Sequence, residues 1–472
     1  MTALVDTLRL TAEDAIGLVE RKEVSPAELH AAYREAIAER DGELHAYLRT
    51  VDEAEGTSIP IALKDVISTK GVETTAGSKI LSGYVPVFDA TVAARCRAAG
   101  LTLLGKTNTD EFAMGSSTEN SAFGPSHNPW DPSRVPGGSG GGSAAAVSGG
   151  LAPWALGSDT GGSIKQPSAL CGNVGLRPTY GTVSRYGIVA LASSLDQVGP
   201  VARTVRDCAF LYSIIAGRDE CDSTTVELPQ DVKLPEGEDL RGIKVGVPKE
   251  LNEAEGIESG VGEAVRAAIA KLEALGAEVG ECSLPQSVEY GMACYYLIMP
   301  AEASSNLARY DGVRYGYRAE ATERLEMYKQ TREQGFGDEP KRRIMVGTYA
   351  LSAGYYDAYY GQAQKVRTVI KREHDALFAT FDALVSPTSP TVAFPLGART
   401  ADPIAMYLSD LLTIPSCMAG LPGLSIPCGL SEGLPVGLQL IGPQFAENTL
   451  FGIGHALEQA IGFDPVPERL RA

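Results

Sequence analysis

The chain has 472 residues, of which 44% are hydrophobic and 21% are charged, a composition that allows a large core and excludes a globally disordered protein. Its 41 basic and 59 acidic residues leave a net charge of -18. This balance argues against a stand-alone nucleic-acid binder, because phosphates are neutralised by clustered lysine and arginine. No segment approaches the roughly 18 uncharged apolar residues of a membrane span, and the first residues lack a signal-peptide core. We therefore expect a cytoplasmic protein without a membrane segment.

Residues 8–50 are predicted to be helical. Thr11 begins a sequence typical of a capping box, and Ser25 begins another with proline at the first helical position. Apolar residues between Leu18 and Ile37 recur at roughly helical spacing. We interpret this region as a pair of helices that docks on the rest of the protein.

A buried strand is predicted over residues 58–67 (SIPIALKDVI), because both of its faces are largely apolar. Lys64 lies inside this run. A lysine at a strand end usually extends its amine into solvent, but a lysine held in apolar surroundings has a depressed pKa and acts as a neutral base. The residues alone leave both interpretations open.

A helix over residues 89–99 and a strand over 101–104 are expected next. Residues 100–107 (GLTLLGKT) match the phosphate-binding pattern G-x-x-x-x-G-K-[ST]. A phosphate loop requires a strand, then the loop, then a helix. Here a helix precedes Gly100, and the four residues after it are mostly apolar, so we expect a strand and no nucleotide site.

Residues 136–178 contain two glycine-rich loops, and each carries a serine: Ser139 in GGSGGG and Ser163 in TGGS. Glycine lets the backbone approach a ligand closely, and such a loop surrounds a serine nucleophile with N–H donors, as acyl transfer requires. Such tracts are also typical of flexible linkers. Apolar segments (APWAL and ALCGNVGL) lie close to the two loops, and residues 144–147 suit a short helix. This context favours the catalytic interpretation.

Residues 137–141 (GGSGG) also match the G-x-S-x-G nucleophile elbow of hydrolases with a histidine base. That elbow follows a strand directly. The preceding NPWDPSRVP contains three prolines, which argue against a central strand. Neither His374 nor His455 has a local context typical of a triad base, so we do not expect this site.

The remaining chain mixes strand and helix signals. The unit over residues 243–247, 260–275 and 277–282 reads strand–helix–strand, which predicts an α/β class with largely parallel pairing. Residues 217–241 are polar and rich in proline and acidic residues, which indicates a surface excursion or hinge. Strand signals recur along the whole chain and favour one large sheet over three separate domains. We further expect short strands and turns over 174–199, helices over 205–216 and 446–461, a tyrosine-rich helical region over 290–377 with a charged loop at 331–343, and strands over 382–385 and 435–442.

The eight cysteines form no C-x-x-C pair, and the five histidines show no metal-ligand spacing with cysteine or with each other. Several cysteines lie in apolar segments. We expect buried free thiols in a reducing compartment and no metal site.

Lys64 in its apolar strand, the segment GGSGGGSAAAVSGG and the segment DTGGSIKQPSALCGNVGLRPTYG together resemble the amidase signature family. The resemblance covers nearly the whole chain. It implies an α/β fold with one large mixed, mostly parallel sheet covered by helices on both faces. It also implies a single domain over residues 1–472, composed of N-terminal helices (1–50), a catalytic core (58–216), the surface excursion (217–241) and a helical region that covers the substrate (285–380).

The resemblance implies a Ser-Ser-Lys triad whose serines stand 24 positions apart, and 163 − 139 gives this spacing. Ser163 is then the nucleophile that becomes acylated, Ser139 relays the proton and follows a cis peptide bond, and Lys64 is the base. The residues agree with this scheme, because a serine hydroxyl is a weak nucleophile without an adjacent base. The expected oxyanion hole consists of the backbone N–H groups of Thr160, Gly161, Gly162 and Ser163.

Two positions depart from the family pattern. Gly140 stands where the family often has serine, and Lys165 where it often has arginine, which gives up bidentate hydrogen bonding. For glutamine as substrate, the resemblance implies Asp410 as the partner of the α-ammonium and Arg343 as the partner of the α-carboxylate. Without the resemblance, the residues indicate only a helix cap at Asp410 and a solvated basic patch at Arg343.

Within the family, the stretches AEASSNLARYDGVRYGYR, KRRIMVGTYALSAGYYDAYYGQAQKVRT and SDLLTIPSCMAGLPGLSIPCGL resemble members that release ammonia from glutamine within tRNA-dependent amidotransferases. This implies two other subunits, giving a heterotrimer that converts Glu-tRNA(Gln) to Gln-tRNA(Gln). The partner subunit uses ATP and magnesium and makes most tRNA contacts, and this chain carries no cofactor. The alternatives are a stand-alone amidase for other carboxamides, a nucleotide-binding module at residues 100–107 and a non-catalytic scaffold.

Overall fold

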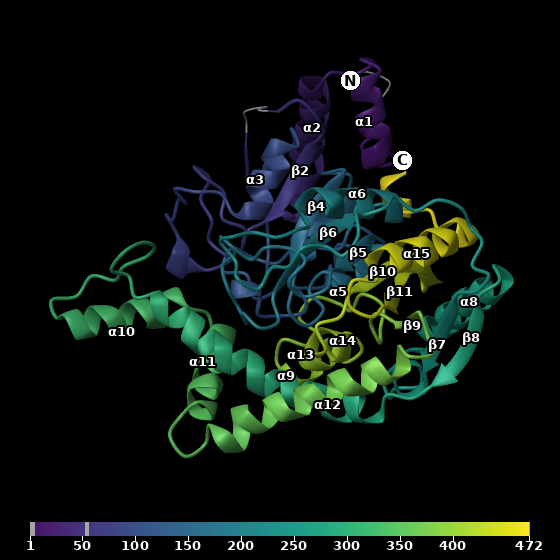
Figure 1. Cartoon of the computed structure of the whole chain (residues 1–472). Helices are drawn as coiled ribbons and strands as arrows, with labels where there is room; N and C mark the ends of the chain where they lie inside the picture. Colours follow the sequence, from purple (N-terminus) through teal and green to yellow (C-terminus); the bar gives the residue numbers. More distant parts are fainter. Residues whose placement is uncertain (1–4, 52–55, 472) are drawn as a thin grey trace.

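The computed structural model describes residues 5–51 and 56–471, and these form one 11-stranded sheet with many helices packed around it (Figure 1). The expectation of one large sheet in an α/β fold is confirmed. Across the sheet the strands follow the order β1-β3-β2-β4-β6-β5-β10-β11-β9-β7-β8. In chain order they are β1 (Tyr47–Thr50), β2 (Pro60–Lys64), β3 (Thr102–Thr107), β4 (Trp154–Asp159), β5 (Val174–Arg177), β6 (Gln197–Ala202), β7 (Lys244–Pro248), β8 (Glu278–Cys282), β9 (Ala383–Pro387), β10 (Gly423–Ser431) and β11 (Leu434–Ile441).

The sheet is mixed, as expected, but it is not mostly parallel. Among the described strands, six neighbouring pairs are antiparallel and four are parallel. Parallel pairing is confined to β3-β2-β4 and to β9-β7-β8. The β7–β8 unit, from which parallel pairing was expected, is parallel. Elsewhere short turns make neighbouring strands antiparallel: Glu432 and Gly433, both with positive φ, form a two-residue turn that joins β10 and β11 as a hairpin.

Helices cover both faces of the sheet. Gly423 of β10 approaches Lys165 of α5, whereas the next residue, Leu424, approaches Gly454 of α15, and successive residues of a strand point to opposite faces. The longer segments are α1 (Ala12–Glu20), α2 (Pro26–Leu44), α3 (Thr91–Ala98), α4 (Gly141–Ser148), α5 (Lys165–Cys171), α6 (Val205–Ile215), α8 (Ser259–Ala274), α9 (Pro285–Asn306), α10 (Arg324–Gly335), α11 (Asp338–Ala350), α12 (Gln362–Leu377) and α15 (Glu447–Ile461). Shorter helices include α7 (Lys249–Asn252), α13 (Pro403–Tyr407) and α14 (Ile414–Met418).

The two predicted N-terminal helices are present as α1 and α2. Thr11 caps α1 by accepting a hydrogen bond from the N–H of Asp14, and Ser25 and Glu28 form the predicted capping box of α2. The helical prediction extended too far, because Tyr47–Thr50 forms β1, antiparallel to β3 at the edge of the sheet. His45, in the left-handed conformation, ends α2 and turns the chain toward this edge. Residues 1–4, at the start of the predicted N-terminal unit, and residue 472, at the end of the predicted domain, lie outside the described residues.

The predicted charged loop over 331–343 is wrong. Residues 331–335 belong to α10 and residues 338–343 to α11, and only Phe336 and Gly337 separate the two helices. Figure 1 shows α10 at the end of an arm that projects from the body of the molecule. Most residues of α10 are exposed, and such a helix needs little apolar periodicity. In α11, by contrast, the charged residues Glu339 and Arg343 are buried and pair with each other.

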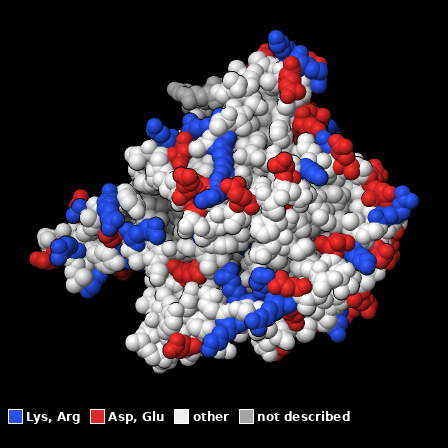
Figure 2. Space-filling model, viewed as in Figure 1, with Lys and Arg blue, Asp and Glu red and all other residues white. Residues whose placement is uncertain are grey.

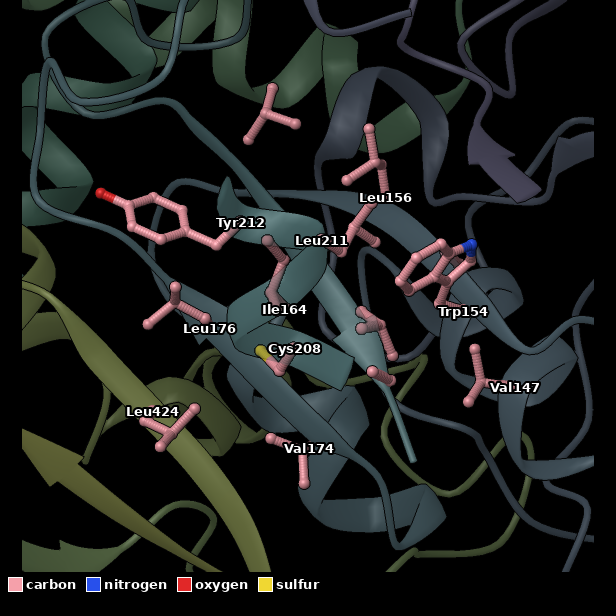
Figure 3. Packing of buried hydrophobic residues seen from close by; sticks show 14 of the residues in the cluster. Val147, Trp154, Leu156, Ile164, Val174, Leu176, Cys208, Leu211, Tyr212 and Leu424 are labelled. Atoms are coloured by element: carbon pink, nitrogen blue, oxygen red, sulfur yellow. The ribbon is translucent and has the colours of Figure 1, made fainter. Parts of the chain in front are cut away.

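The core of the molecule lies between the sheet and its helices. Figure 3 shows α6 placing Cys208, Leu211 and Tyr212 over the strands that carry Leu156 and Leu176, all of them buried. Lys106, the lysine of the phosphate-loop pattern, is completely buried in β3. Its Nζ donates to the Ile67 carbonyl at 2.6 Å and to Thr74 Oγ1 at 2.8 Å. The expectation of a strand at this position is confirmed, and Lys106 is engaged inside the protein.

Candidate active site

Lys64 is the last residue of β2, and its side chain is completely buried. Its Nζ lies 2.7 Å from Ser139 Oγ, 3.0 Å from Ser158 Oγ and 3.2 Å from the Ser158 carbonyl oxygen. Burial lowers the pKa of Lys64 from its ordinary 10.5 to about 7, although buried aspartates nearby act in the opposite direction. The amine therefore points into the protein, and the alternative of a lysine that reaches solvent is excluded.

Ser139 lies in the first glycine-rich loop, two residues before α4 begins, and is fully buried. The Gly138–Ser139 peptide bond is cis. A Cβ at Gly138 would stand 2.3 Å from Asp110 Oδ2, so glycine is required for this close approach. The described segment before the loop (residues 128–136) contains no strand, which agrees with the rejection of a nucleophile elbow.

Ser163 follows β4 in the second glycine-rich loop, and the two loops are joined by a hydrogen bond from the N–H of Gly140 to the Ser163 carbonyl (3.1 Å). Ile164, the next residue, anchors the loop to the sheet. Cβ atoms built on Gly157, Gly175 and Gly199 would lie 2.9, 3.0 and 3.2 Å from its side chain. Glycines in three neighbouring strands thus make room for Ile164. The Ser163 side chain beside it is 7% exposed, so it is not completely closed off from solvent.

Asp159 holds the second loop in shape. Its carboxylate accepts hydrogen bonds from the N–H groups of Gly162 (3.0 Å) and Ile164 (2.9 Å). Arg177 lies 3.1 Å from the same carboxylate and also donates to the Asp159 carbonyl. Burial by itself raises the pKa of Asp159, but the charges of Arg177 and Lys165 outweigh it and hold the pKa below its ordinary value. Asp159 is thus an ionised side chain that fixes the backbone around Ser163.

The four expected oxyanion-hole donors are not equivalent. The N–H of Gly162 is already bonded to Asp159. Within the described part of the chain, no hydrogen bond engages the N–H groups of Gly161 and Ser163. Thr160 is fixed by its side chain, which donates to Asp196 Oδ1 at 2.7 Å. Among the described residues, the N–H groups of Thr160, Gly161 and Ser163 therefore remain unengaged, and those of Gly161 and Ser163 lie nearest to the Ser163 hydroxyl along the chain.

Asp410 lies against the second glycine-rich loop. Thr413 Oγ1, one turn beyond Asp410, donates to the Gly161 carbonyl at 2.6 Å, and a Cβ at Gly162 would lie 3.4 Å from Asp410 Oδ1. Ser116 Oγ donates to Asp410 Oδ2 at 2.5 Å, while Oδ1 is buried and has no hydrogen-bond partner among the residues that the structure describes. Burial raises the pKa of Asp410 to about 8. A buried carboxylate oxygen that lacks a partner is suited to receive a cationic group of a ligand.

Arg343 lies in α11 and is 4% exposed, so it is not the solvated patch that its sequence context suggests. Its Nε donates to Glu339 Oε1 at 2.5 Å, and Tyr407 Oη donates to the same oxygen at 2.9 Å. The guanidinium also lies 4.6 and 4.3 Å from the ring centres of Tyr296 and Tyr407. The charge of Arg343 lowers the pKa of Asp410 against the effect of burial, which is consistent with both residues bordering one site.

The structure shows which groups surround Lys165 and Gly140, the two residues that depart from the family pattern. Lys165 is buried, and its Nζ donates to Ser416 Oγ (2.9 Å), Gln439 Oε1 (3.1 Å) and the Thr413 carbonyl (3.4 Å). A single ammonium therefore supports the segment that carries Thr413, without a guanidinium fork. At Gly140, a Cβ would stand 2.5 Å from the Ser163 carbonyl, so the two loops pack closely at this point.

Three site residues were missed by sequence reasoning: Ser158, which contacts Lys64; Asp159, which fixes the nucleophile loop; and Ser116, which donates to Asp410. Ser158 and Asp159 stand directly before TGGS, so their position in the motif was a usable signal. Ser116 is distant in sequence from Asp410 and gave none.

Among the described residues, no group of three or more histidine, cysteine, aspartate or glutamate side chains is arranged to hold a metal ion. Over the same residues, no helix is long and apolar enough to cross a membrane. The structure brings the two serine-bearing loops together beside a buried amine, and a serine with an adjacent base is what acyl transfer requires.

The chain resembles known proteins in both sequence and fold. The sequence profile of the amidase family matches residues 28–451. The chain is 56% identical over 471 residues to the A subunit of the glutamyl-tRNA(Gln) amidotransferase of Moorella thermoacetica, with 96% of each chain covered. The crystal structure of the corresponding A subunit from Thermotoga maritima has a TM-score of 0.85 at 47% identity over 98% of both chains. The native peptide amidase from Stenotrophomonas maltophilia, at 28% identity, has a TM-score of 0.80 over 98% of this chain and 99% of that chain. The chain therefore belongs to the amidase signature family.

Proposed function

We propose that this chain is the glutamine-hydrolysing, ammonia-producing subunit of a glutamyl-tRNA(Gln) amidotransferase. The single observation that carries the chemistry is the 2.7 Å contact between the buried Lys64 Nζ and Ser139 Oγ, beside the loop of Ser163. The near full-length similarity to the amidotransferase subunits of Moorella thermoacetica and Thermotoga maritima supports the choice of glutamine as substrate.

In the proposed acylation step, Ser163 Oγ attacks the side-chain amide carbon of glutamine. Its proton passes to Ser139 Oγ as the Ser139 proton passes to the neutral Lys64 amine. A new C–O bond forms, and the carbonyl oxygen becomes an oxyanion that accepts hydrogen bonds from Gly161 and Ser163. The C–N bond then breaks, and the proton returns through Ser139 to the departing ammonia. Each oxyanion donor of this kind contributes on the order of 3 kcal/mol to catalysis.

Deacylation uses the same groups in the same order. Water takes the place of the ammonia, loses a proton through Ser139 to Lys64, and attacks the glutamyl ester on Ser163. The ester C–O bond breaks, Ser163 recovers its proton, and glutamate leaves. The base therefore starts and ends each half-reaction neutral, which requires a pKa near the working pH, and the burial of Lys64 meets this requirement.

Glutamine is oriented by its charged end. The α-ammonium binds the free Oδ1 of Asp410, and the α-carboxylate binds the guanidinium of Arg343, whose fixed fork suits a carboxylate. Tyr296 and Tyr407 hold that guanidinium in place. An ammonium bound at Asp410 also favours the ionised carboxylate, so substrate binding opposes the effect of burial on the Asp410 pKa.

The released ammonia passes to a partner subunit that activates glutamyl-tRNA with ATP and magnesium, in a complex of this chain with two other subunits. The partner makes most of the tRNA contacts. The net charge of -18 supports this division of labour, as does the face seen in Figure 2, where basic side chains are interspersed with acidic ones and form no continuous surface.

The test compares two nitrogen sources in the assembled complex. Lys64→Ala and Ser139→Ala are expected to reduce glutamine-driven amidation of glutamyl-tRNA by orders of magnitude while ammonium-driven amidation stays near the wild-type rate. Loss of both activities would indicate damage to folding or assembly. A chain that is fully active without partners on simple amides would favour a stand-alone amidase, and full glutamine-driven activity in Ser163→Ala would favour a scaffold.

A further inference from the structure

The strand that precedes the loop of Ser163 provides two hydrogen-bond partners for the Lys64 amine. Ser158 is the last residue but one of β4, which runs parallel to β2. Its hydroxyl and its carbonyl oxygen lie 3.0 and 3.2 Å from Lys64 Nζ. Ser158 is 5% exposed, so water does not replace these contacts readily.

The geometry points to Ser158 as a positioning residue that aims the lone pair of the neutral Lys64 amine at Ser139. This inference rests on the proposed role of Lys64 as the base. A neutral amine has two N–H donors and one lone pair, and three oxygen atoms surround Nζ. A carbonyl oxygen only accepts hydrogen bonds, so one N–H points at the Ser158 carbonyl. When the second N–H points at Ser158 Oγ, the lone pair is left facing Ser139.

The three distances agree with this assignment. Both contacts to Ser158 lie within the ordinary range for N–H···O hydrogen bonds, whereas the 2.7 Å contact to Ser139 Oγ stands at its short end and is typical of a hydroxyl donor. The protonated amine is accommodated by the same three oxygens, because it donates to all of them. Lys64 therefore changes charge during the reaction without losing a partner.

Ser158 also links the base to the nucleophile loop. Its neighbour Asp159 binds the N–H groups of Gly162 and Ile164, on either side of Ser163. One β-strand end thus holds both the amine and the loop that presents the nucleophile. A shift of this strand end would displace both catalytic groups together, so the precision of the Lys64–Ser139 contact depends on Ser158.

The test uses three variants in the assembled complex. Ser158→Ala removes the hydroxyl but keeps the carbonyl, Ser158→Thr restores a hydroxyl, and Ser143→Ala is the matched control. Ser143 is a buried serine whose hydroxyl lies 3.3 Å from the Leu156 carbonyl in the same strand and does not contact Lys64. We expect Ser158→Ala to lower kcat for glutamine hydrolysis about tenfold with KM nearly unchanged, and Ser158→Thr to recover most of it.

The pH profile separates positioning from a merely structural role. The protonated amine makes the stronger hydrogen bond to Ser158 Oγ, so removing this hydroxyl disfavours the charged form and lowers the pKa of Lys64. With saturating glutamine, the α-ammonium is bound to Asp410 and the acid limb of kcat reports Lys64. This limb is therefore expected to move to lower pH in Ser158→Ala and to stay in place in Ser143→Ala. An unmoved limb, a limb that moves upward, or a faster Ser158→Ala enzyme would overturn the inference.

A second readout does not depend on glutamine. A small alkyl fluorophosphonate reacts with an activated serine: Ser163 Oγ forms a bond to phosphorus, the P–F bond breaks, fluoride leaves and the proton passes toward Lys64. The rate of this labelling should show the same fall and the same shift of its acid limb in Ser158→Ala. If wild-type protein is labelled with this pH dependence but does not hydrolyse glutamine, the proposed substrate is wrong while the role of Ser158 is retained. Equal labelling of wild type and Ser158→Ala at every pH rejects that role.

Discussion

Replacing Lys64 by methionine tests whether the amine is held neutral inside the protein. In the folded chain, burial lowers the pKa of Lys64 from 10.5 to about 7, whereas the unfolded chain returns it to its ordinary value. Between these two values the unfolded state binds more protons than the folded state, so the free energy of unfolding rises with pH. The contribution is fully present above about pH 10.5 and is lost as pH falls to about 7. Lys64→Met removes this dependence.

The magnitude follows from the two pKa values. A difference of about 3.5 in pKa corresponds to about 5 kcal/mol of unfolding free energy over the whole range. Between pH 7 and about 9.5, wild type is expected to gain roughly 3 kcal/mol relative to Lys64→Met. The hydrogen bonds that the variant loses to Ser139 and Ser158 change the absolute stability but not its pH dependence. The comparison therefore uses the difference between the two proteins at each pH.

The assay is denaturant unfolding of wild type, Lys64→Met and Lys233→Met at several pH values from 7 to about 9.5. Lys233, in an exposed segment, controls for the loss of any lysine. We expect the stability difference between wild type and Lys64→Met to grow with pH in favour of wild type, and Lys233→Met to follow wild type. Parallel stability curves for wild type and Lys64→Met would refute the reasoning, because they would mean that Lys64 has the same affinity for protons in both states.

Three further predictions concern the substrate site. Burial raises the pKa of Asp410 to about 8, so KM for glutamine should rise as pH falls below about 8. Asp410→Asn should raise KM and abolish its pH dependence. A KM that depends on pH equally in the variant would contradict the role of Asp410. Arg343→Lys should raise KM for glutamine at least tenfold with a smaller effect on kcat, since lysine lacks the bidentate guanidinium and its stacking on the tyrosine rings. An unchanged KM in steady-state assays would count against binding of the glutamine α-carboxylate by Arg343. Glu111 accepts hydrogen bonds from Ser78 Oγ and from the N–H of Gly337, the residue before α11, which carries Arg343. Glu111→Gln should therefore lower the unfolding free energy by about 1–3 kcal/mol and raise KM several-fold. An unaltered denaturation midpoint would exclude this anchoring role.

The sequence was most informative where one physical requirement forced a local pattern. Lys64 could be singled out because a lysine inside an apolar strand is unusual, and the two glycine-rich loops because close backbone packing excludes side chains. The structure bears out the packing: Gly138 and Gly140 each lack room for a Cβ. The apolar residues after Gly100 predict a strand at the phosphate-loop pattern, and β3 lies there.

The sequence was least informative where distant segments decide the outcome. Asp410 and Arg343 were identified only through the family resemblance, because much of what surrounds them is distant in the chain. Ser116 contacts Asp410, and the rings of Tyr296 and Tyr407 lie against Arg343. The antiparallel half of the sheet was missed because strand direction depends on connections that periodicity does not report. The charges of residues 331–343 indicate a loop, but they have two other causes. Helix α10 is largely exposed and its polar residues face water, whereas Glu339 and Arg343 of α11 are buried and pair with each other.

The central claim, that Ser163 hydrolyses glutamine with Lys64 and Ser139, is tested most directly by ammonia release from glutamine. Wild type and Ser163→Ala would be assayed alone and then with the two partner subunits, glutamyl-tRNA and ATP. We predict ammonia release by wild type that appears or rises sharply in the complex, and none above background in Ser163→Ala, while ammonium-driven amidation by the variant complex is retained. Wild-type rates of ammonia release in the Ser163→Ala complex would contradict this claim.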